Sequence, residues 1–387
     1  MVAYGFARSQ QVYKRNSIVN IIILSRFYIG KHNVGLENRL NRIDGLRGIA
    51  IFGVIAVHSQ MAFHTTFHLV NVGQYGVQLF FLISGYILSF VAENDKNLTA
   101  PVFLAKRFFR LAPMYYFVLM VCFLIGFNEQ LESGVNRVEL NLTTFLWHLS
   151  FLHGLHPDYL RSVYSVMWSL TPEVVFYLIF PFLNKLNDKN LWAGLLVALV
   201  LAKPFVALSL WTHFNEGVAI WIGHSPLAAM PCFLFGMLVY RDRELFNSDK
   251  WRYLGLIAIC LFLMDGSGLL SEKFTRVFSI LFGNPFVMYV LLMFPALVYW
   301  KGTCTSTIME NEKLDMLGKV SYSAFFIHYA VIYVTKDFQI DLPYYIGLPM
   351  VLLITFYLSN FTYLYFEQRC IRFGNKFILR VMNRCAT

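Results

Sequence analysis

The chain has 387 residues, of which 57% are hydrophobic and 14% charged, and its formal net charge at pH 7 is +10. Soluble globular proteins carry about 25% charged residues, so this composition excludes a surface that faces water on every side. The positive charge lies at the chain ends and beside apolar segments, which is typical of membrane topology rather than of nucleic-acid binding. No nucleic-acid partner is therefore expected.

Apolar residues occur in long runs instead of alternating with polar ones. Such runs predict transmembrane helices, because the backbone must satisfy its own hydrogen bonds where water is absent. Alternating segments of about ten residues, typical of membrane barrels, are not seen. The apolar segments lie at about 46–63, 72–91, 109–127, 143–155, 167–183, 191–210, 224–240, 251–264, 282–300, 318–335 and 344–366.

Charge at the two ends predicts that both termini are cytoplasmic. Eight Lys and Arg residues precede position 48 against two acidic residues, and five follow Phe366 against Glu367 alone. Basic residues beside spans mark cytoplasmic ends. Two ends on one side require an even number of crossings, so one of the eleven segments is predicted not to span.

The segment 143–155 is the predicted exception, because it is short and carries two His residues. A run of this length favours a re-entrant or interfacial helix. The prediction is an all-α, polytopic transmembrane bundle of about ten spans in the cell inner membrane. It divides into a basic N-terminal arm (1–41), a membrane domain (42–368) and a basic tail (369–387). The loop 128–142 is expected outside, and the connections 92–108, 185–190, 241–250 and 301–317 inside.

The first apolar segment supplies the first candidate site residues. Charged and His side chains within spans are costly, which makes them functional candidates. Arg47 and His58 are eleven residues apart, so they are expected on nearly the same helix face, roughly 16 Å apart. Asp44 is expected to pair with Arg47. A neutral His58 could accept a proton near pH 7; the alternative is a structural hydrogen bond to a neighbouring helix.

The second segment contains three glycines and one serine of interest. Gly73, Gly76 and Gly85 predict close approach between helices. Ser84 is expected to hydrogen-bond across helices, since no partner that would activate it as a nucleophile is adjacent in sequence.

Further candidates lie in the middle of the chain. Arg107 and Arg110, three residues apart on one helix, could grip phosphates at the inner membrane edge, or could simply anchor the helix. Glu173 lies in an apolar run, so an Arg, a His or a helix N-terminus is expected near it. It is either a second acid/base group or a structural partner.

Late in the chain, Tyr322 and His328 lie in one predicted span. Pairs such as His64 with His68, or His153 with His156, lack a third ligand nearby, so no metal is expected. The six cysteines are scattered and show no C-x-x-C spacing, which favours inert thiols.

These blocks together resemble acyltransferase family 3, the bacterial-type polytopic membrane O-acyltransferases. The resemblance covers about residues 42–370. It is carried by Arg-Ile-Asp-Gly-Leu-Arg-Gly with His58 placed R-x10-H after Arg47, by the Gly-Val-Gln-Leu-Phe-Phe-Leu-Ile-Ser-Gly-Tyr block, and by Arg107-x-x-Arg110 with Pro113. Trp168-Ser-Leu-x-x-Glu173, Ser321-Tyr322 through His328, and Phe366-Glu367 complete it.

The resemblance implies transfer of an acetyl group from cytoplasmic acetyl-CoA to a hydroxyl of a glycan or lipid-linked glycan. By this resemblance, His58 is the catalytic candidate, with Arg47 as its basic partner and Arg107 and Arg110 as donor-binding residues. Two positions depart from the family pattern. Gln78 stands where Asp is frequent, and Gln368 stands where Pro is common after the Glu.

The expected site therefore combines residues from the resemblance with residues that the sequence itself singled out. His58, Arg47 and Glu173 are the catalytic candidates, and Asp44, Ser84, Tyr322 and His328 are expected to support them. Membrane lipid is the expected surrounding partner.

The acceptor is not named by the sequence. Within the family a cell-surface polysaccharide such as lipopolysaccharide O-antigen or exopolysaccharide is the commonest role, and a small secreted glycoside is an alternative. A proton-coupled secondary transporter is the rival class. Such a protein would usually show two similar halves, and none are apparent here.

Overall fold

The structure is a computed structural model that describes residues 34–95, 98–127, 138–210, 216–271, 273–274, 277, 284–300, 309–338 and 342–385. Every regular element in this part of the chain is helical, and it contains no strand. The predicted all-α class is therefore confirmed. Most of the N-terminal arm (1–33) and of the outer loop (128–137) lies outside the described residues.

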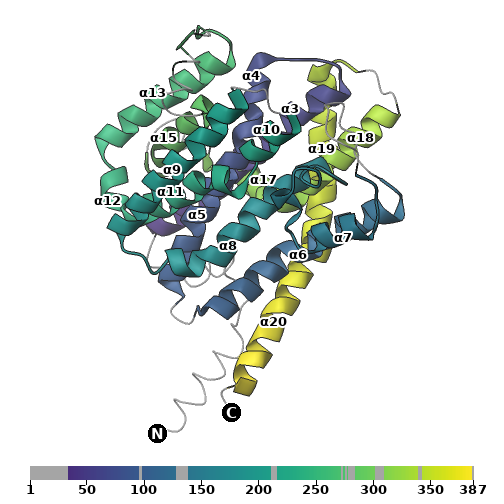
Figure 1. Cartoon of the computed structure of the whole chain (residues 1–387), viewed down its shortest axis with the longest axis horizontal. Helices are drawn as coiled ribbons and strands as arrows, with labels where there is room; N and C mark the ends of the chain where they lie inside the picture. The colour runs from purple at the N-terminus through teal and green to yellow at the C-terminus, as the bar shows by residue number, and fades with distance from the viewer. Residues whose placement is uncertain are drawn as a thin grey trace.

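The long helices match the predicted apolar segments in order (Figure 1). They are α3 (Val34–Ala62), α5 (Gly76–Asn94), α6 (Ala100–Leu124), α8 (Leu170–Leu183), α9 (Asp188–Leu210), α11 (Pro226–Arg241), α13 (Asp249–Gly266), α15 (Pro285–Tyr299), α18 (Ser321–Asp337) and α19 (Tyr344–Thr362). Shorter elements are α4 (His68–Asn71), η1 (Val72–Tyr75), α7 (Leu142–Leu149), η2 (His153–Leu155), η3 (Ser165–Ser169), α10 (Glu216–Gly223), α12 (Arg243–Phe246), α17 (Glu312–Lys319), η4 (Tyr363–Glu367) and α20 (Gln368–Cys385).

The segment 143–155 does not form a spanning helix. It contains the eight-residue α7 and the short 3₁₀ turn η2. At 1.5 Å per residue α7 is about 12 Å long, against a hydrocarbon core of about 30 Å. By length and composition alone, five helical stretches of the described chain suit a membrane span, or six if α17 and α18 are taken together.

Two long helices begin well before the apolar segments that predicted them. Helix α6 begins at Ala100 rather than 109, and α3 begins at Val34 rather than 46. Apolar runs mark only the part of a helix that can lie in lipid. Lys and Arg also favour helix, so these helices continue into charged sequence. The basic tail is likewise helical, as α20.

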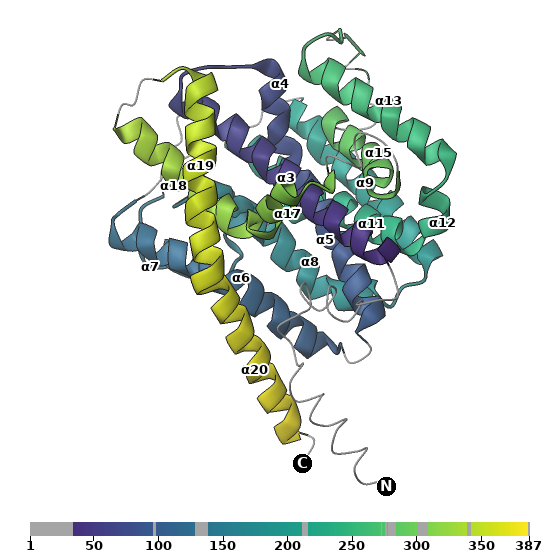
Figure 2. The ribbon, with the colours of Figure 1, turned by 180° about the vertical axis from the view of Figure 1, so that it is seen from behind.

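Helix α3 lies at the centre of the bundle, against α5, α17, α18 and α19 (Figure 2). The predicted role of glycine in close packing is confirmed on α5. A Cβ added at Gly85 would overlap the backbone carbonyl of Phe233 on α11, and one added at Gly236 would overlap that of Leu82 on α5. The two backbones therefore touch directly, which only residues without a side chain permit.

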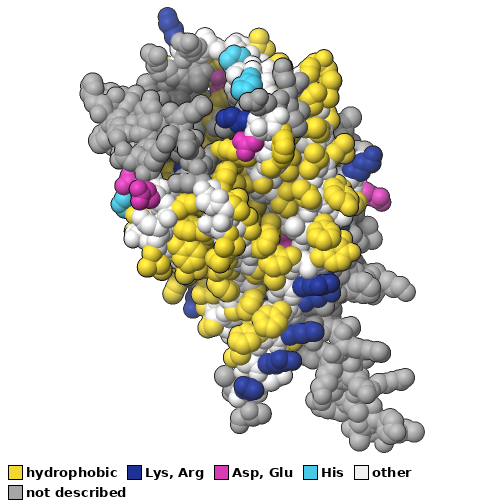
Figure 3. Space-filling view, turned by 90° about the vertical axis from the view of Figure 1, so that its right-hand side faces the viewer, with side chains coloured by type: hydrophobic (Ala, Val, Ile, Leu, Met, Phe, Trp, Pro, Cys, Tyr) yellow, Lys and Arg dark blue, Asp and Glu magenta, His cyan; other side chains and the backbone are white. Residues whose placement is uncertain are grey.

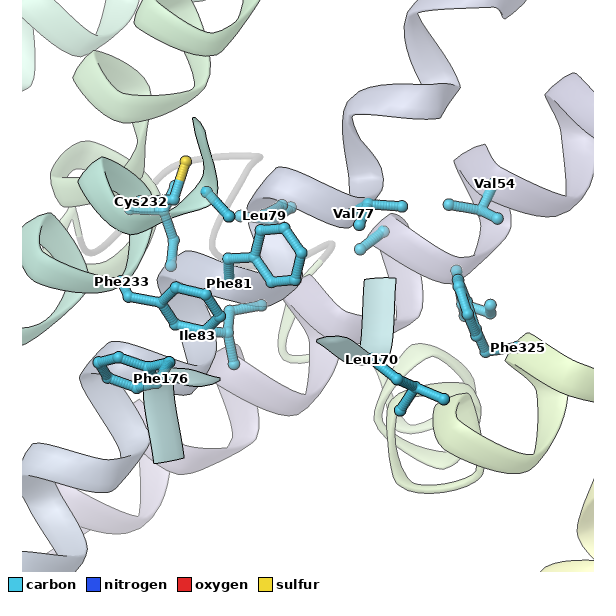
Figure 4. Packing of buried hydrophobic residues seen from close by; sticks show 14 of the residues in the cluster. Val54, Val77, Leu79, Phe81, Ile83, Leu170, Phe176, Cys232, Phe233 and Phe325 are labelled. Atoms are coloured by element: carbon cyan, nitrogen blue, oxygen red, sulfur yellow. The ribbon is translucent and has the colours of Figure 1, made fainter. Parts of the chain in front are cut away.

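An aromatic layer fills the space between α5, α8 and α11 (Figure 4). The ring of Phe233 stacks on Phe176 with centroids 4.1 Å apart and lies 4.7 Å from Phe81. Such pairs contribute about 0.5–1.5 kcal/mol each beyond the area they bury. This layer fixes the helices that carry the site described below.

The outer surface carries many exposed apolar side chains (Figure 3). Leu353 and Tyr357 on α19 are 70% and 74% exposed, and Leu124 on α6 is 78% exposed. A soluble protein would bury such groups, whereas lipid solvates them. The chain is a multi-pass membrane protein.

Helices α19 and α20, joined by η4, form one continuous stretch of 41 residues from Tyr344 to Arg384 (Figures 1 and 2). A helix of that length extends about 60 Å, roughly twice the hydrocarbon thickness. The C-terminal part of this stretch, α20, must therefore leave the membrane. It carries basic residues, and Lys and Arg side chains are seen in dark blue in the lower part of Figure 3.

Candidate active site

Six of the predicted site residues line one cavity of about 140 Å³. They come from five helices: Arg47 from α3, Ser84 from α5, Arg107 and Arg110 from α6, Glu173 from α8 and Tyr322 from α18. No hairpin of two neighbouring helices could bring all six together. The cavity is therefore a product of the tertiary fold.

Glu173 is the carboxylate of this cavity and lies in the first turn of α8. It accepts a short hydrogen bond from the Tyr177 hydroxyl and one of 3.4 Å from Ser84 Oγ. Glu173 therefore lies at a helix N-terminus, as the sequence predicted, and the dipole of α8 stabilises a negative charge there. Tyr177 was missed by the sequence reasoning, although its i, i+4 spacing from Glu173 was a usable signal.

The three arginines have different surroundings. Arg47 pairs with Asp44 at 3.4 Å, which confirms the predicted contact. Arg110 forms an ion pair with Glu367. Arg107 contacts the rings of Phe103 and Tyr177, with its guanidinium carbon 5.7 and 5.9 Å from the ring centroids, and its buried Nε has no hydrogen-bond partner among the described residues.

Glu367 owes its position to η4, a single π-helical turn between α19 and α20. It is 2% exposed and also accepts a hydrogen bond of 2.7 Å from Ser323 Oγ. A π turn inserts an extra residue and so rotates the next helical turn about the axis, and such turns are frequent at functional sites. The sequence showed a carboxylate at the end of a span but not that it faces inward.

A helix N-terminus also reaches the cavity. Helices α17 and α18 are bent by 79° at a break between Lys319 and Ser321, so α18 begins there. Ser321 and Tyr322 line the cavity, and Tyr322 donates a 2.7 Å hydrogen bond to the Leu111 carbonyl. The free N–H groups of a helix start add positive potential to that of the arginines.

His58 does not line this cavity. It lines a second, more open cavity with Gln60, His64, Thr65, Thr66, Asn71 and Gln74. Arg47 and His58 lie on the same helix, α3, but they line different cavities. Ten residues of α3 lie between them, and three of these, Ile51, Val54 and Ile55, are fully buried.

The second predicted intramembrane histidine contacts the first. His58 Nδ1 lies 3.0 Å from His328 Nε2, and the ring of Tyr329 meets that of His58 edge-on with centroids 5.1 Å apart. His328 is fully buried. The sequence placed both residues in spans but gave no sign that they touch.

Apolar side chains separate the two cavities. Val77, Leu170 and Phe325 line the first cavity and lie near Val54 (Figure 4). The ring of Phe325 also lies 6.0 Å from that of His328. The first cavity therefore ends in an apolar wall, with the histidine pair behind it.

The chain matches known proteins along most of its length. The profile of the acyltransferase 3 family, described as an acyltransferase domain, matches residues 40–363. Acyltransferase MdmB of Streptomyces mycarofaciens is 24% identical over 319 residues, which cover 76% of this chain and 79% of that protein. No solved structure matches significantly.

Two further relatives are longer proteins. Peptidoglycan O-acetyltransferase OatA of Listeria monocytogenes is 24% identical over 315 residues, covering 76% of this chain and 49% of the relative. O-acetyltransferase OatA of Staphylococcus aureus is 21% identical over 358 residues, covering 86% and 57%. The chain thus spans about half the length of these two. On the extent of the profile match, it belongs to acyltransferase family 3 and is a membrane acyltransferase.

Proposed function

We propose that the protein is an O-acetyltransferase of the cell inner membrane, which moves an acetyl group from cytoplasmic acetyl-CoA to a hydroxyl of a cell-surface polysaccharide. The observation that carries the proposal is the pair of cavities. One gathers three arginines and a carboxylate, and the other presents His58 beside amide and hydroxyl side chains.

The proposal places the two cavities toward opposite membrane faces. In this arrangement the chain crosses the membrane about ten times. The six helical stretches that best suit a span supply six of these crossings, and four shorter or more polar helices supply the others. Both termini then lie in the cytoplasm. The five basic residues of α20 support that orientation, because Lys and Arg beside spans favour the cytoplasmic side. The arginine cavity then opens toward the cytoplasm and His58 faces outward.

The arginine cavity suits the donor. All three phosphates of coenzyme A are negatively charged at neutral pH, and forked guanidiniums hold phosphate oxygens with charge-assisted hydrogen bonds. Arg107, with a buried Nε that has no described partner, has the most unused donor capacity of the three. The apolar wall of Val77, Leu170 and Phe325 suits a short acyl group.

The outer cavity suits a sugar. Side-chain amides and hydroxyls such as those of Gln74 and Thr66 can donate and accept hydrogen bonds with sugar hydroxyls. Acyl transfer to an alcohol needs a base for the hydroxyl proton, and His58 is placed to supply it. O-antigen and exopolysaccharide are the acceptors that we favour, and a peptidoglycan acceptor is supported by the name of one OatA relative.

The test is mass spectrometry of surface glycans from cells that make the wild-type protein, no protein, His58→Ala or His156→Ala. His156 is a partly exposed histidine outside both cavities, so its variant is the matched control. We expect an acetyl increment with wild type and His156→Ala and its absence in the other two.

Each other outcome has a definite meaning. Full acetylation with His58→Ala would remove His58 from the chemistry. Identical glycans in all four strains would refute the polysaccharide acceptor. The secreted small glycosides would then be compared in the same four strains.

A further inference from the structure

The histidine pair determines which nitrogen of His58 is available for chemistry. His328 Nδ1 lies 3.0 Å from the carbonyl oxygen of Ala324, one turn earlier on α18. A carbonyl oxygen can only accept a hydrogen bond, so His328 Nδ1 carries the proton. In a neutral ring, His328 Nε2 is then an acceptor without a proton.

This acceptor lies 3.0 Å from Nδ1 of His58. Two bare nitrogens would repel each other, so His58 Nδ1 must carry a proton and donate it. Nε2 of the neutral His58 ring is then left with a free lone pair. The two nitrogens of an imidazole ring point in different directions. Because Nδ1 of His58 faces His328 on α18, Nε2 of His58 points away from α18.

We propose that His328 is a positioning residue that holds His58 in its Nδ1–H tautomer, which makes Nε2 of His58 the atom that takes the proton of the acceptor hydroxyl. The proposal rests on the proposed function, in which His58 is the base. It identifies the reacting atom and requires the acceptor hydroxyl to approach on the Nε2 side.

The proton balance is complete without any further reactant. The step requires the thioester to extend from the arginine cavity past the apolar wall of Val77, Leu170 and Phe325 to His58. The acceptor oxygen then forms a bond to the acyl carbon while His58 Nε2 takes the hydroxyl proton. The carbon–sulfur bond of the thioester breaks, and the proton on Nε2 goes to the departing thiolate. Throughout, the Nδ1–H of His58 stays hydrogen-bonded to His328, which spreads the positive charge of the transient imidazolium.

The surroundings restrain the pair. His328 is fully buried, and the carbonyl of the nearby Phe326 accepts a hydrogen bond of 2.5 Å from the Tyr164 hydroxyl. The edge of the Tyr329 ring against His58 restrains its rotation. In serine proteases the analogous partner fixes the histidine tautomer, and losing the correct tautomer there lowers kcat by roughly 10⁴.

His224 offers a matched control. Its Nδ1 also donates to a carbonyl one turn earlier, that of Ile220 at 2.7 Å, so its Nε2 is likewise an acceptor. That nitrogen lies 3.2 Å from Arg161 instead of a histidine. A partly buried histidine with the same backbone bond can thus be changed without removing the hydrogen bond between His58 and His328.

The first test is direct. Solid-state NMR of the full chain, labelled with ¹⁵N-histidine in lipid vesicles, distinguishes protonated from unprotonated ring nitrogens, and the His58 signals are assigned by their absence in His58→Gln. We expect a protonated Nδ1 and an unprotonated Nε2 for His58 in wild type. An Nε2–H tautomer would overturn the proposal.

The second test compares rates of label transfer from radiolabelled acetyl-CoA to endogenous glycan in membrane vesicles. A phenylalanine cannot accept a hydrogen bond, so His328→Phe should lower kcat about 100-fold, within the usual range for acid–base groups. The KM for acetyl-CoA should change less than about twofold, because bound donor does not need His58. His328→Gln, whose amide oxygen can accept from Nδ1–H, should recover to within about tenfold of wild type, and His224→Gln should match wild type.

The outcomes separate the two proposals. Activity retained by His58→Ala would refute the role of His58 itself. An inactive His58→Ala beside a fully active His328→Phe would refute only the positioning role. Equal losses in His328→Phe and His328→Gln would also refute it, since a purely structural defect would not distinguish an acceptor from a non-acceptor.

Discussion

Arg110 on α6 forms an ion pair with Glu367, which the π turn η4 directs into the bundle. Glu367 is 2% exposed and is held from its other side by Ser323. The pair therefore joins the helix that carries two arginines of the cavity to the last helix of the bundle. Arg110, one of the two arginines predicted to bind the donor, therefore also has a structural partner.

Breaking this pair should destabilise the protein strongly. We expect Glu367→Gln to lower the free energy of unfolding by about 3–5 kcal/mol, because it leaves a buried guanidinium without its counter-charge. Thermal unfolding of the purified protein in detergent measures this. The control is Asp95→Asn, which loses a more exposed pair with Lys106 at 3.0 Å and should cost about 1 kcal/mol or less. Equal effects would mean that Arg110 does not depend on Glu367.

Removing the charge of Arg107 should weaken donor binding. We expect Arg107→Gln to raise the KM for acetyl-CoA about 10- to 100-fold, since a hydrogen bond to a charged group contributes about 1.5–3 kcal/mol. Initial rates over a range of acetyl-CoA concentrations give this value. Arg243→Gln is the control, because Arg243 pairs with Glu93 away from the cavity, and its KM should be that of wild type. An unchanged KM in Arg107→Gln would favour the anchoring role.

Glu173 should matter for its charge as well as its shape. Glutamine can still accept from Tyr177 and Ser84 but carries no negative charge beside the three arginines. Because the electric field at the bound thioester changes, we expect Glu173→Gln to lower kcat at least about tenfold with little change in melting temperature. Glu93→Gln is a close control, because Glu93 also accepts a hydrogen bond from a tyrosine, Tyr240, outside the cavity. Near-normal turnover of Glu173→Gln would leave Glu173 with only a structural role.

The apolar wall should limit the length of the acyl group. Phe325 is 8% exposed, and its ring closes the cavity toward His328. We expect Phe325→Ala to raise the ratio of butyryl-CoA to acetyl-CoA turnover about tenfold, since a few methylene groups of pocket space are worth about 1–3 kcal/mol each. Competition between the two thioesters measures the ratio directly. Phe294→Ala, a buried phenylalanine outside both cavities, should leave it unchanged.

Close packing of α5 on α11 should not tolerate a side chain at Gly85. Valine there would overlap the Phe233 backbone, so we expect Gly85→Val to reduce folded yield and to lower the melting temperature by several degrees, in line with overpacking costs of about 1–3 kcal/mol. Gly194 on α9 meets nothing within 4 Å, and Gly194→Ala should be neutral or stabilising. Wild-type stability of Gly85→Val would mean that the helices separate without penalty.

The sequence alone determined the class of the protein and most of its helices. Long apolar runs leave the backbone no partner but itself, so they specify helices whatever the neighbours are. The short run at 143–155 was recognised by the same argument. The order of the motifs identified the family, which the profile match then confirmed.

Only the tertiary structure decided which residues meet. Periodicity placed Arg47 and His58 on one face, but the apolar layer around Val54 and Phe325 puts them in different cavities. The contact of His58 with His328, and that of Arg110 with Glu367, join helices far apart in the chain. Helix periodicity describes one helix at a time, whereas these contacts depend on how helices cross. The crossings are set by the close packing at Gly85 and Gly236, by the break between α17 and α18, and by the π turn η4.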